Sequence, residues 1–100
     1  MTNNKVKKYS WAWYDGEGNY SNTAPSMEHI IRMVVDYYFA EESDVCVVQE
    51  GESFIITYNN IHADKKCTET IGADEDSVVA FLEELAQSVG RVDEFGICEI

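Results

Sequence analysis

The chain of 100 residues carries 19 acidic residues against seven basic ones, which gives a formal net charge of −12. This charge repels nucleic acids and anionic membranes, so we expect neither as a ligand. Apolar residues make up 45% of the chain and aromatic residues 12%, which excludes a disordered acidic tail. We therefore expect a single folded domain over residues 1–100, with a flexible N-terminus at residues 1–6.

The first predicted element is a β-hairpin at residues 7–21. Aromatic and polar side chains alternate through Trp11 and Trp13, and Gly16 and Gly18 supply the residues of a tight turn. The two tryptophans then share one face of the hairpin. We interpret this face as part of the core, with contact to a partner as the alternative.

An amphipathic helix is predicted next. Pro25 suits a first helical turn, and either Thr23 or Ser26 can cap it. Apolar residues follow at helical spacing and form one stripe: Met27, Ile30, Ile31, Val34, Val35 and Tyr38.

Three strands and a second helix complete the predicted order. The strands cover residues 45–48, 54–58 and 66–71. Asp74 suits the N-cap of the second helix and Gly90 its end, and a short strand follows at residues 95–100.

The order ββ-α-βββ-α-β predicts an α+β domain with a largely antiparallel sheet and two helices. The apolar residues of the helices should be buried between the helices and one face of that sheet. The residues expected there are Ile31, Val34, Val35, Phe81, Leu82 and Leu85.

Cysteine usage and hydropathy bear on the compartment. Three cysteines cannot all pair within one chain, and the N-terminus lacks the apolar core of a secretory signal. No apolar run approaches the ~20 residues of a membrane helix. We expect a cytoplasmic protein in a reducing environment.

The cysteines also allow a metal-site hypothesis. Cys46, Cys67 and Cys98 fall on predicted strands, and His62 precedes one of them. Adjacent strands would bring thiolates and an imidazole together, and these are the ligands that zinc prefers. No Cys-x-x-Cys motif is present, and the alternative is that each cysteine packs as a small apolar residue.

We expect no catalytic activity. Cys67 and His62 are the one nucleophile–base pair that the sequence suggests, and no catalytic signature surrounds them. No glycine-rich phosphate loop precedes a helix.

Two acidic runs are the candidate binding residues. They comprise Glu41, Glu42 and Asp44, and Asp74, Glu75 and Asp76. Neither run has the spacing of a calcium loop, so both are interpreted as contacts for lysine and arginine side chains of a basic protein partner. The alternative is that the negative charge serves solubility alone.

The chain resembles, at the level of a class, the small inhibitors that phages and mobile elements make against host nucleases. The resemblance lies in its length, its acidity and the acidic runs at 41–44, 74–76 and 93–94. Anti-CRISPR proteins are one such class. The resemblance implies an inhibitor, acting in the cytosol of a host cell, that occupies a basic nucleic-acid channel or blocks a conformational step of an RNA-guided nuclease. Immunity proteins against nuclease toxins are similar in size and charge. A zinc-stabilised structural or regulatory module is the remaining hypothesis.

Overall fold

The computed structural model describes residues 8–100, except for the side chain of Glu41. The flexible N-terminus predicted for residues 1–6 lies outside the described residues. The elements in chain order are β1 (Tyr9–Tyr14), β2 (Asn19–Ala24), α1 (Met27–Phe39), a 3-10 helix η1 (Glu41–Ser43), β3 (Cys46–Glu50), β4 (Ser53–Asn60), β5 (Lys65–Gly72), α2 (Glu75–Ser88) and β6 (Glu94–Glu99). The predicted α+β class and the order ββ-α-βββ-α-β are confirmed.

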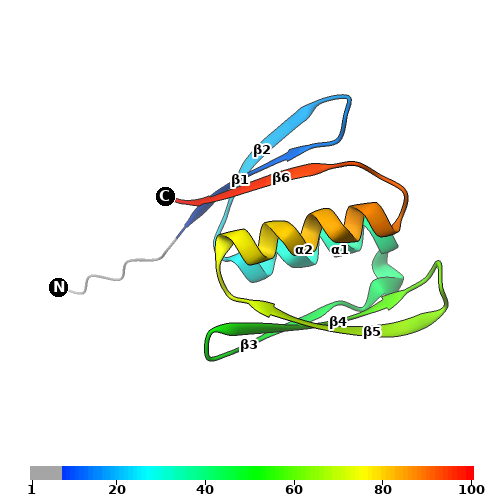
Figure 1. Cartoon of the computed structure of the whole chain (residues 1–100). Coiled ribbons are helices and arrows are strands. Elements are labelled where there is room, and N and C mark those ends of the chain that lie inside the picture. The colour runs from blue at the N-terminus through cyan, green and yellow to red at the C-terminus, as the bar shows by residue number, and fades with distance from the viewer. Residues whose placement is uncertain (1–7) are drawn as a thin grey trace.

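The strands form two antiparallel sheets of three strands each, ordered β2-β1-β6 and β3-β4-β5. Figure 1 shows both helices lying between these sheets, so the domain has three layers. We expected the helices to pack on one sheet face. The difference arises because the N-terminal hairpin pairs with the last strand, β6, and closes a second sheet over the other side of the helices.

Each sheet turns one apolar face toward the helices. In β4 the buried side chains alternate strictly, as the period of a strand requires, through Phe54, Ile56 and Tyr58. In β1 the buried positions are Tyr9 and Trp11. The predicted helical residues are all buried against these faces: Ile31, Val34, Val35, Phe81, Leu82 and Leu85.

Side-chain caps fix where both helices begin. The Ser26 hydroxyl accepts a hydrogen bond of 3.2 Å from the backbone N–H of His29, so Ser26 and not Thr23 caps α1. The Asp74 carboxylate accepts one of 3.0 Å from the N–H of Ser77. Each cap occupies a backbone donor that the first helical turn leaves free.

The end of α2 is a Schellman motif. Gly90 has a positive φ of 79°, the N–H of Gly90 donates to the carbonyl of Gln87, and the N–H of Arg91 donates to that of Ala86. This turn sends the chain back toward the first sheet and places Arg91 and Asp93 between α2 and β6.

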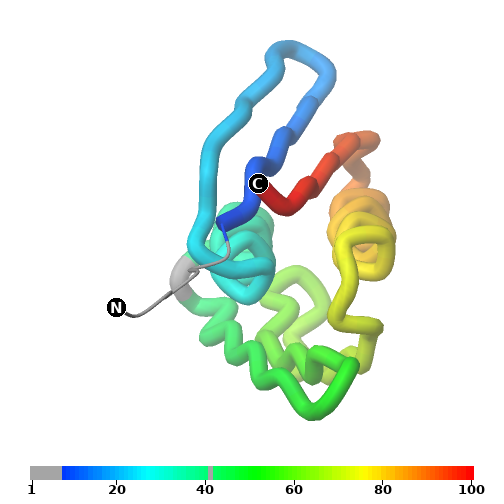
Figure 2. The backbone as a smooth tube through the Cα atoms, turned by 90° about the vertical axis from the view of Figure 1, so that its left-hand side faces the viewer, coloured from blue at the N-terminus to red at the C-terminus, as the bar shows by residue number. Residues whose placement is uncertain are grey.

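Strand β2 departs from the layered packing. Only Ala24 among its six residues is buried. Figures 1 and 2 both show the tip of the β1–β2 hairpin standing away from the helices. Of the two described α-helices, neither is long and apolar enough to cross a membrane.

Candidate functional site

The two acidic runs lie at opposite ends of the helical layer. Glu41, Glu42 and Asp44 follow the C-terminus of α1, whereas Asp74, Glu75 and Asp76 form the N-terminus of α2. The two helices begin on the same side of the molecule, so the runs are on opposite sides (Figure 1). They do not form one continuous surface, and each has to be considered with its own neighbours.

The end that holds the start of α2 gathers further carboxylates from the β3–β4 turn. Glu52 and Asp74 line one shallow hollow, and the carbonyl of Glu52 accepts a hydrogen bond of 2.8 Å from the N–H of Ala73. Glu50 is the last residue of β3 in the same turn and is exposed. We call this surface the acidic end and define it by Glu50, Glu52, Asp74, Glu75 and Asp76. No lysine or arginine occurs in the two segments that form it, 49–53 and 72–77.

The opposite end has a mixed charge. Glu42 lines a hollow together with Asp64, Lys65 and Lys66 of the β4–β5 turn and the start of β5. Asp44 is exposed nearby in sequence. We call this surface the mixed end. Because both of its lysines can offset carboxylates, its potential is weaker than that of the acidic end.

Over residues 8–100, with the side chain of Glu41 aside, the structure has a single ion pair, between Arg91 and Asp93. The other described carboxylates therefore have no salt bridge to a described lysine or arginine. A surface of this kind attracts cationic partners over a distance set by the ionic strength.

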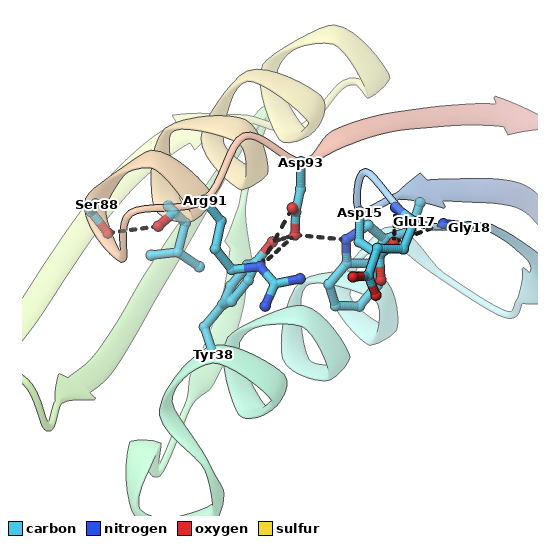
Figure 3. A network of polar contacts seen from close by, with 9 residues as sticks. Asp15, Glu17, Gly18, Tyr38, Ser88, Arg91 and Asp93 are labelled. Carbon is cyan, nitrogen blue, oxygen red and sulfur yellow. Dashed lines mark hydrogen bonds and ion pairs between the residues drawn. The ribbon is translucent and has the colours of Figure 1, made fainter.

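Asp93 is the one acidic residue that is buried in the described part of the chain, at 5% exposure. One oxygen of its carboxylate accepts hydrogen bonds from the indole N–H of Trp13 at 3.0 Å, the hydroxyl of Tyr38 at 2.5 Å and the Nε of Arg91 at 3.1 Å. Figure 3 shows Tyr38 and Arg91 converging on this carboxylate. Burial, together with the hydrogen bond to Asp93, raises the pKa of Tyr38 well above its usual value.

The network around Asp93 positions a set of aromatic rings. Trp13 meets the ring of Tyr37 edge to face, with centroids 4.7 Å apart. The guanidinium carbon of Arg91 lies 5.6 Å from the centroid of Tyr37 and 5.9 Å from that of Tyr38. Both distances are within the range of a cation–π interaction.

A hollow of about 250 Å³ opens beside these rings. It is lined by Trp13, Asp15, Tyr20 and Tyr37, and we call it the aromatic pocket. Tyr20 is 59% exposed and Tyr37 is 57% exposed, whereas Trp13 is half-buried. The Asp15 carboxylate accepts hydrogen bonds of 3.0 Å from the N–H groups of Glu17 and Gly18, and these bonds lower the pKa of Asp15 below its usual value.

The structure does not assemble the predicted zinc site. Cys46 is paired with Thr57 and Cys67 with Tyr58 across β4. Directly paired residues share a sheet face and successive residues alternate, so the two thiols lie on opposite faces of one sheet. Cys98 lies on β6 in the other sheet.

His62, the fourth predicted ligand, packs elsewhere. Its ring centroid is 5.6 Å from that of Phe39, and its Nε2 lies 3.4 Å from the carbonyl oxygen of Tyr38. Within residues 8–100 no cluster of three His, Cys, Asp or Glu side chains is arranged to hold a metal ion. Zinc binding stays a prediction, and it would require a different arrangement of these strands.

Cys67 has a neighbour that the sequence did not indicate. Cys67 is partly exposed and is paired with Tyr58 on the neighbouring strand. Burial is the main cause that raises the pKa of Tyr58 to about 12, and the adjacent Cys67 side chain is the next cause. This contact supports the packing alternative for Cys67.

Sequence reasoning missed the aromatic pocket. Tyr20 was part of the predicted hairpin, but its exposure depends on how far that hairpin stands from the helices. One signal was available: Met33 and Tyr37 lie four residues apart in α1, outside the apolar stripe. Two large apolar residues on the polar side of a helix indicate an exposed contact surface.

Comparisons with known proteins do not extend these observations. No family model, curated protein or solved structure matches this chain.

Proposed function

We propose that the protein is a non-enzymatic inhibitor that binds a basic nucleic-acid-handling protein through its acidic surface and blocks the loading of nucleic acid. An RNA-guided nuclease of the CRISPR type is the target that we favour, because the class resemblance of the sequence points there. The protein would then act in the host cytosol, where such nucleases work. Nuclease toxins are targets with the same surface chemistry.

The observation that carries this proposal is the distribution of charge. Within residues 8–100, the one described ion pair joins the partly exposed Arg91 to the buried Asp93 beside the aromatic rings, and the exposed carboxylates have no such partner. A basic channel that normally holds phosphates supplies the missing counter-charges. This complementarity favours rapid association, because opposite potentials steer the encounter of two proteins.

We place the primary contact at the acidic end. Its carboxylates come from two segments that a backbone hydrogen bond joins, so they are held on one rigid surface. The mixed end carries Lys65 and Lys66 among its carboxylates and should be repelled in part by a basic channel. Of the two predicted runs, the one at Asp74, Glu75 and Asp76 is therefore the stronger candidate.

The test is a panel of purified CRISPR nucleases and nuclease toxins. We expect the protein to inhibit cleavage by at least one of them, and the association rate to fall steeply as salt rises, since exposed charges are screened beyond about 8 Å at physiological ionic strength. Biolayer interferometry measures the association rate constant at each salt concentration.

Two matched double variants locate the contact. Glu50→Gln with Glu52→Gln removes two charges from the acidic end, and Glu42→Gln with Asp44→Asn removes two from the mixed end. We expect the first to slow association more than the second. Equal rates for both variants and for the parent protein, at low and high salt alike, would leave the charge as a solubility device and contradict the proposal.

A further inference from the structure

The aromatic pocket has the composition of a site for a cationic side chain. Three of its lining residues are aromatic, and the fourth is a carboxylate: Trp13, Tyr20, Tyr37 and Asp15. The negative faces of aromatic rings attract cations, and a nearby carboxylate adds a direct counter-charge. An apolar anchor would gain nothing from Asp15, whose carboxylate would lose water without gaining a partner.

The geometry of the rings supports this reading. Trp13 and Tyr37 stand nearly perpendicular, with an interplanar angle of 81°, so they form two walls of a corner. Tyr20 reaches the same hollow from β2, in a different element. A hollow of about 250 Å³ is large enough for the end of a lysine or arginine side chain.

The protein already places one guanidinium against one of these rings, that of Tyr37. Arg91 lies 5.6 Å from the centroid of Tyr37, and its charge is compensated by Asp93. The positive charge of Arg91 also acts on Asp15, but the main causes of the low pKa of Asp15 are the two backbone hydrogen bonds in its turn. Asp15 therefore keeps its negative charge at neutral pH, and Glu17 in the same turn is exposed and adds a second carboxylate.

The hollow does not end at these four residues. A second hollow of about 530 Å³ shares Trp13 and Tyr20 with it and continues along β2 and Met33. Its further lining includes the polar side chains of Asn19 and Asn22. An extended segment that inserts one basic side chain into the aromatic pocket can thus lay its neighbouring residues along this groove.

We propose that the aromatic pocket receives the side chain of an arginine or lysine presented by a partner protein. The inference rests on the proposed function in one respect, that the partner is basic. It adds a specific anchor at the β1–β2 hairpin, away from the acidic carboxylates that steer the encounter. Such an anchor slows dissociation, whereas the acidic end accelerates association.

The pocket can be tested without knowing the partner. The probes are capped pentapeptides with neutral ends, Gly-Gly-X-Gly-Gly, in which X is arginine, lysine, citrulline or norleucine. Citrulline keeps the shape of arginine without its charge, and norleucine is an apolar chain of similar length. The readout is the indole N–H resonance of Trp13 in a nitrogen–proton correlation spectrum during titration.

We expect the arginine and lysine peptides to shift this resonance saturably, with an affinity at least fivefold tighter than that of the citrulline peptide. Tyr37→Leu removes the ring face and keeps an apolar side chain, and it should weaken binding by about fivefold. Tyr37→Phe keeps the ring and should bind like the parent protein. Tighter binding of the norleucine peptide, or equal binding of arginine and citrulline, would overturn the inference.

Attraction of the peptide by Asp15 has to be distinguished from its attraction by the net negative charge of the whole protein. Asp15→Asn removes one charge in the pocket and keeps an oxygen that can accept the turn hydrogen bonds, whereas Glu50→Gln removes one charge at the acidic end. We expect Asp15→Asn to lower the affinity for the arginine peptide by about fivefold. Glu50→Gln should leave that affinity within about twofold of the parent protein's. Equal losses in the two variants would show attraction by net charge alone and would also overturn the inference.

The two proposals can fail separately. If the peptides bind but no nuclease is inhibited, the aromatic pocket is supported as a binding site and the proposed target is refuted. Nuclease inhibition without any peptide binding refutes the aromatic pocket and keeps the acidic end. Unchanged thermal midpoints in all four variants confirm that each result reports binding and not unfolding.

Discussion

The two sheets of this domain have three strands each but are packed differently against the helices. In the β3-β4-β5 sheet, β4 is the central strand, and its inward residues are almost wholly enclosed. In the β2-β1-β6 sheet, β1 is the central strand, and β2 carries exposed side chains on both faces. The edge strands β3 and β5 also bury little, but Val47 of β3 is buried and Cys67 and Ile71 of β5 pack against the core, whereas β2 contributes Ala24 alone. We call the β2-β1-β6 sheet the open sheet for this reason.

The comparison indicates where the molecule has surface available for recognition. A strand that buries little adds little to stability, so the side chains on β2 are constrained mainly by what they meet outside the fold. The aromatic pocket lies where this strand faces α1. This division between an enclosed strand, β4, and an open one, β2, should have its largest effect on stability.

Truncation of one residue in each sheet tests the division directly. Ile56 is fully enclosed in β4, so Ile56→Ala should lower the free energy of unfolding by about 2–5 kcal/mol. Tyr20 is 59% exposed in β2, and Tyr20→Ala should change it by no more than about 0.5 kcal/mol. Urea denaturation measures both. Similar losses in the two variants would mean that β2 belongs to the core.

The carboxylate of Asp93 joins the open sheet to α1, because its partners are Trp13 in β1 and Tyr38 in α1. Asp93→Asn keeps the shape of the side chain but removes its charge. It also places an amide NH2 group, which can only donate, among the donors of Trp13, Tyr38 and Arg91. We expect a loss of about 1–3 kcal/mol in the free energy of unfolding. Tyr38→Phe removes one of the three donors and keeps its ring, so it should cost less. A smaller loss for Asp93→Asn than for Tyr38→Phe would show that this carboxylate does not organise the cluster.

The junction between the open hairpin and α1 depends on one cap. Ser26→Ala should reduce the free energy of unfolding by about 1 kcal/mol, since the N–H of His29 loses its acceptor. Thr23→Ala is the matched control, because Thr23 is exposed on β2 and does not cap the helix. Thermal unfolding of the two variants side by side is sufficient. Equal midpoints would argue against the assigned cap.

The smallest effect is expected with pH. Hydrogen bonds from the Ser77 hydroxyl and N–H lower the pKa of Asp74 below its usual value of 3.8. The folded state thus holds this proton less tightly than the unfolded state does. The contribution of Asp74 to stability is present above a pH of about 4 and is lost as pH falls through the lower folded pKa.

Asp74→Asn removes this titration and keeps a cap. The difference between the melting temperatures of parent and variant should therefore shrink as pH is lowered from about 6 to about 3. A difference that is constant over this range would mean that the Asp74 carboxylate has the same pKa in both states. Asp15 in the β1–β2 turn has the same sign of shift and offers a second site for this measurement.

Local patterns predicted the elements but not their assembly. The stripe in α1, the cap at Asp74 and the turn at Gly90 depend on neighbours within one helix, and all three are confirmed. The division into two sheets depends on the pairing of β1 with β6 across most of the chain, which no local pattern specifies. For the same reason, sequence reasoning placed two cysteines near each other that lie on opposite faces of a sheet.

The tryptophans illustrate the same limit within one strand. Trp11 and Trp13 share a face and were predicted together. The indole N–H of Trp13 donates to Asp93, 80 residues away, whereas that of Trp11 is buried without a hydrogen-bond partner among the described residues. Only the assembled fold distinguishes them, and it makes Trp13 the one that lines the aromatic pocket.

The contact between Glu83 and β6 limits where the β2-β1-β6 sheet can be extended. The Glu83 carboxylate accepts a hydrogen bond of 3.1 Å from the backbone N–H of Phe95, on the side of β6 that no strand covers. An added strand would need that donor, so α2 closes this margin of the sheet to extension. Among residues 8–100 no helix side chain makes such a hydrogen bond to β2, so β2 is the margin of this sheet that stays available for pairing with a further strand.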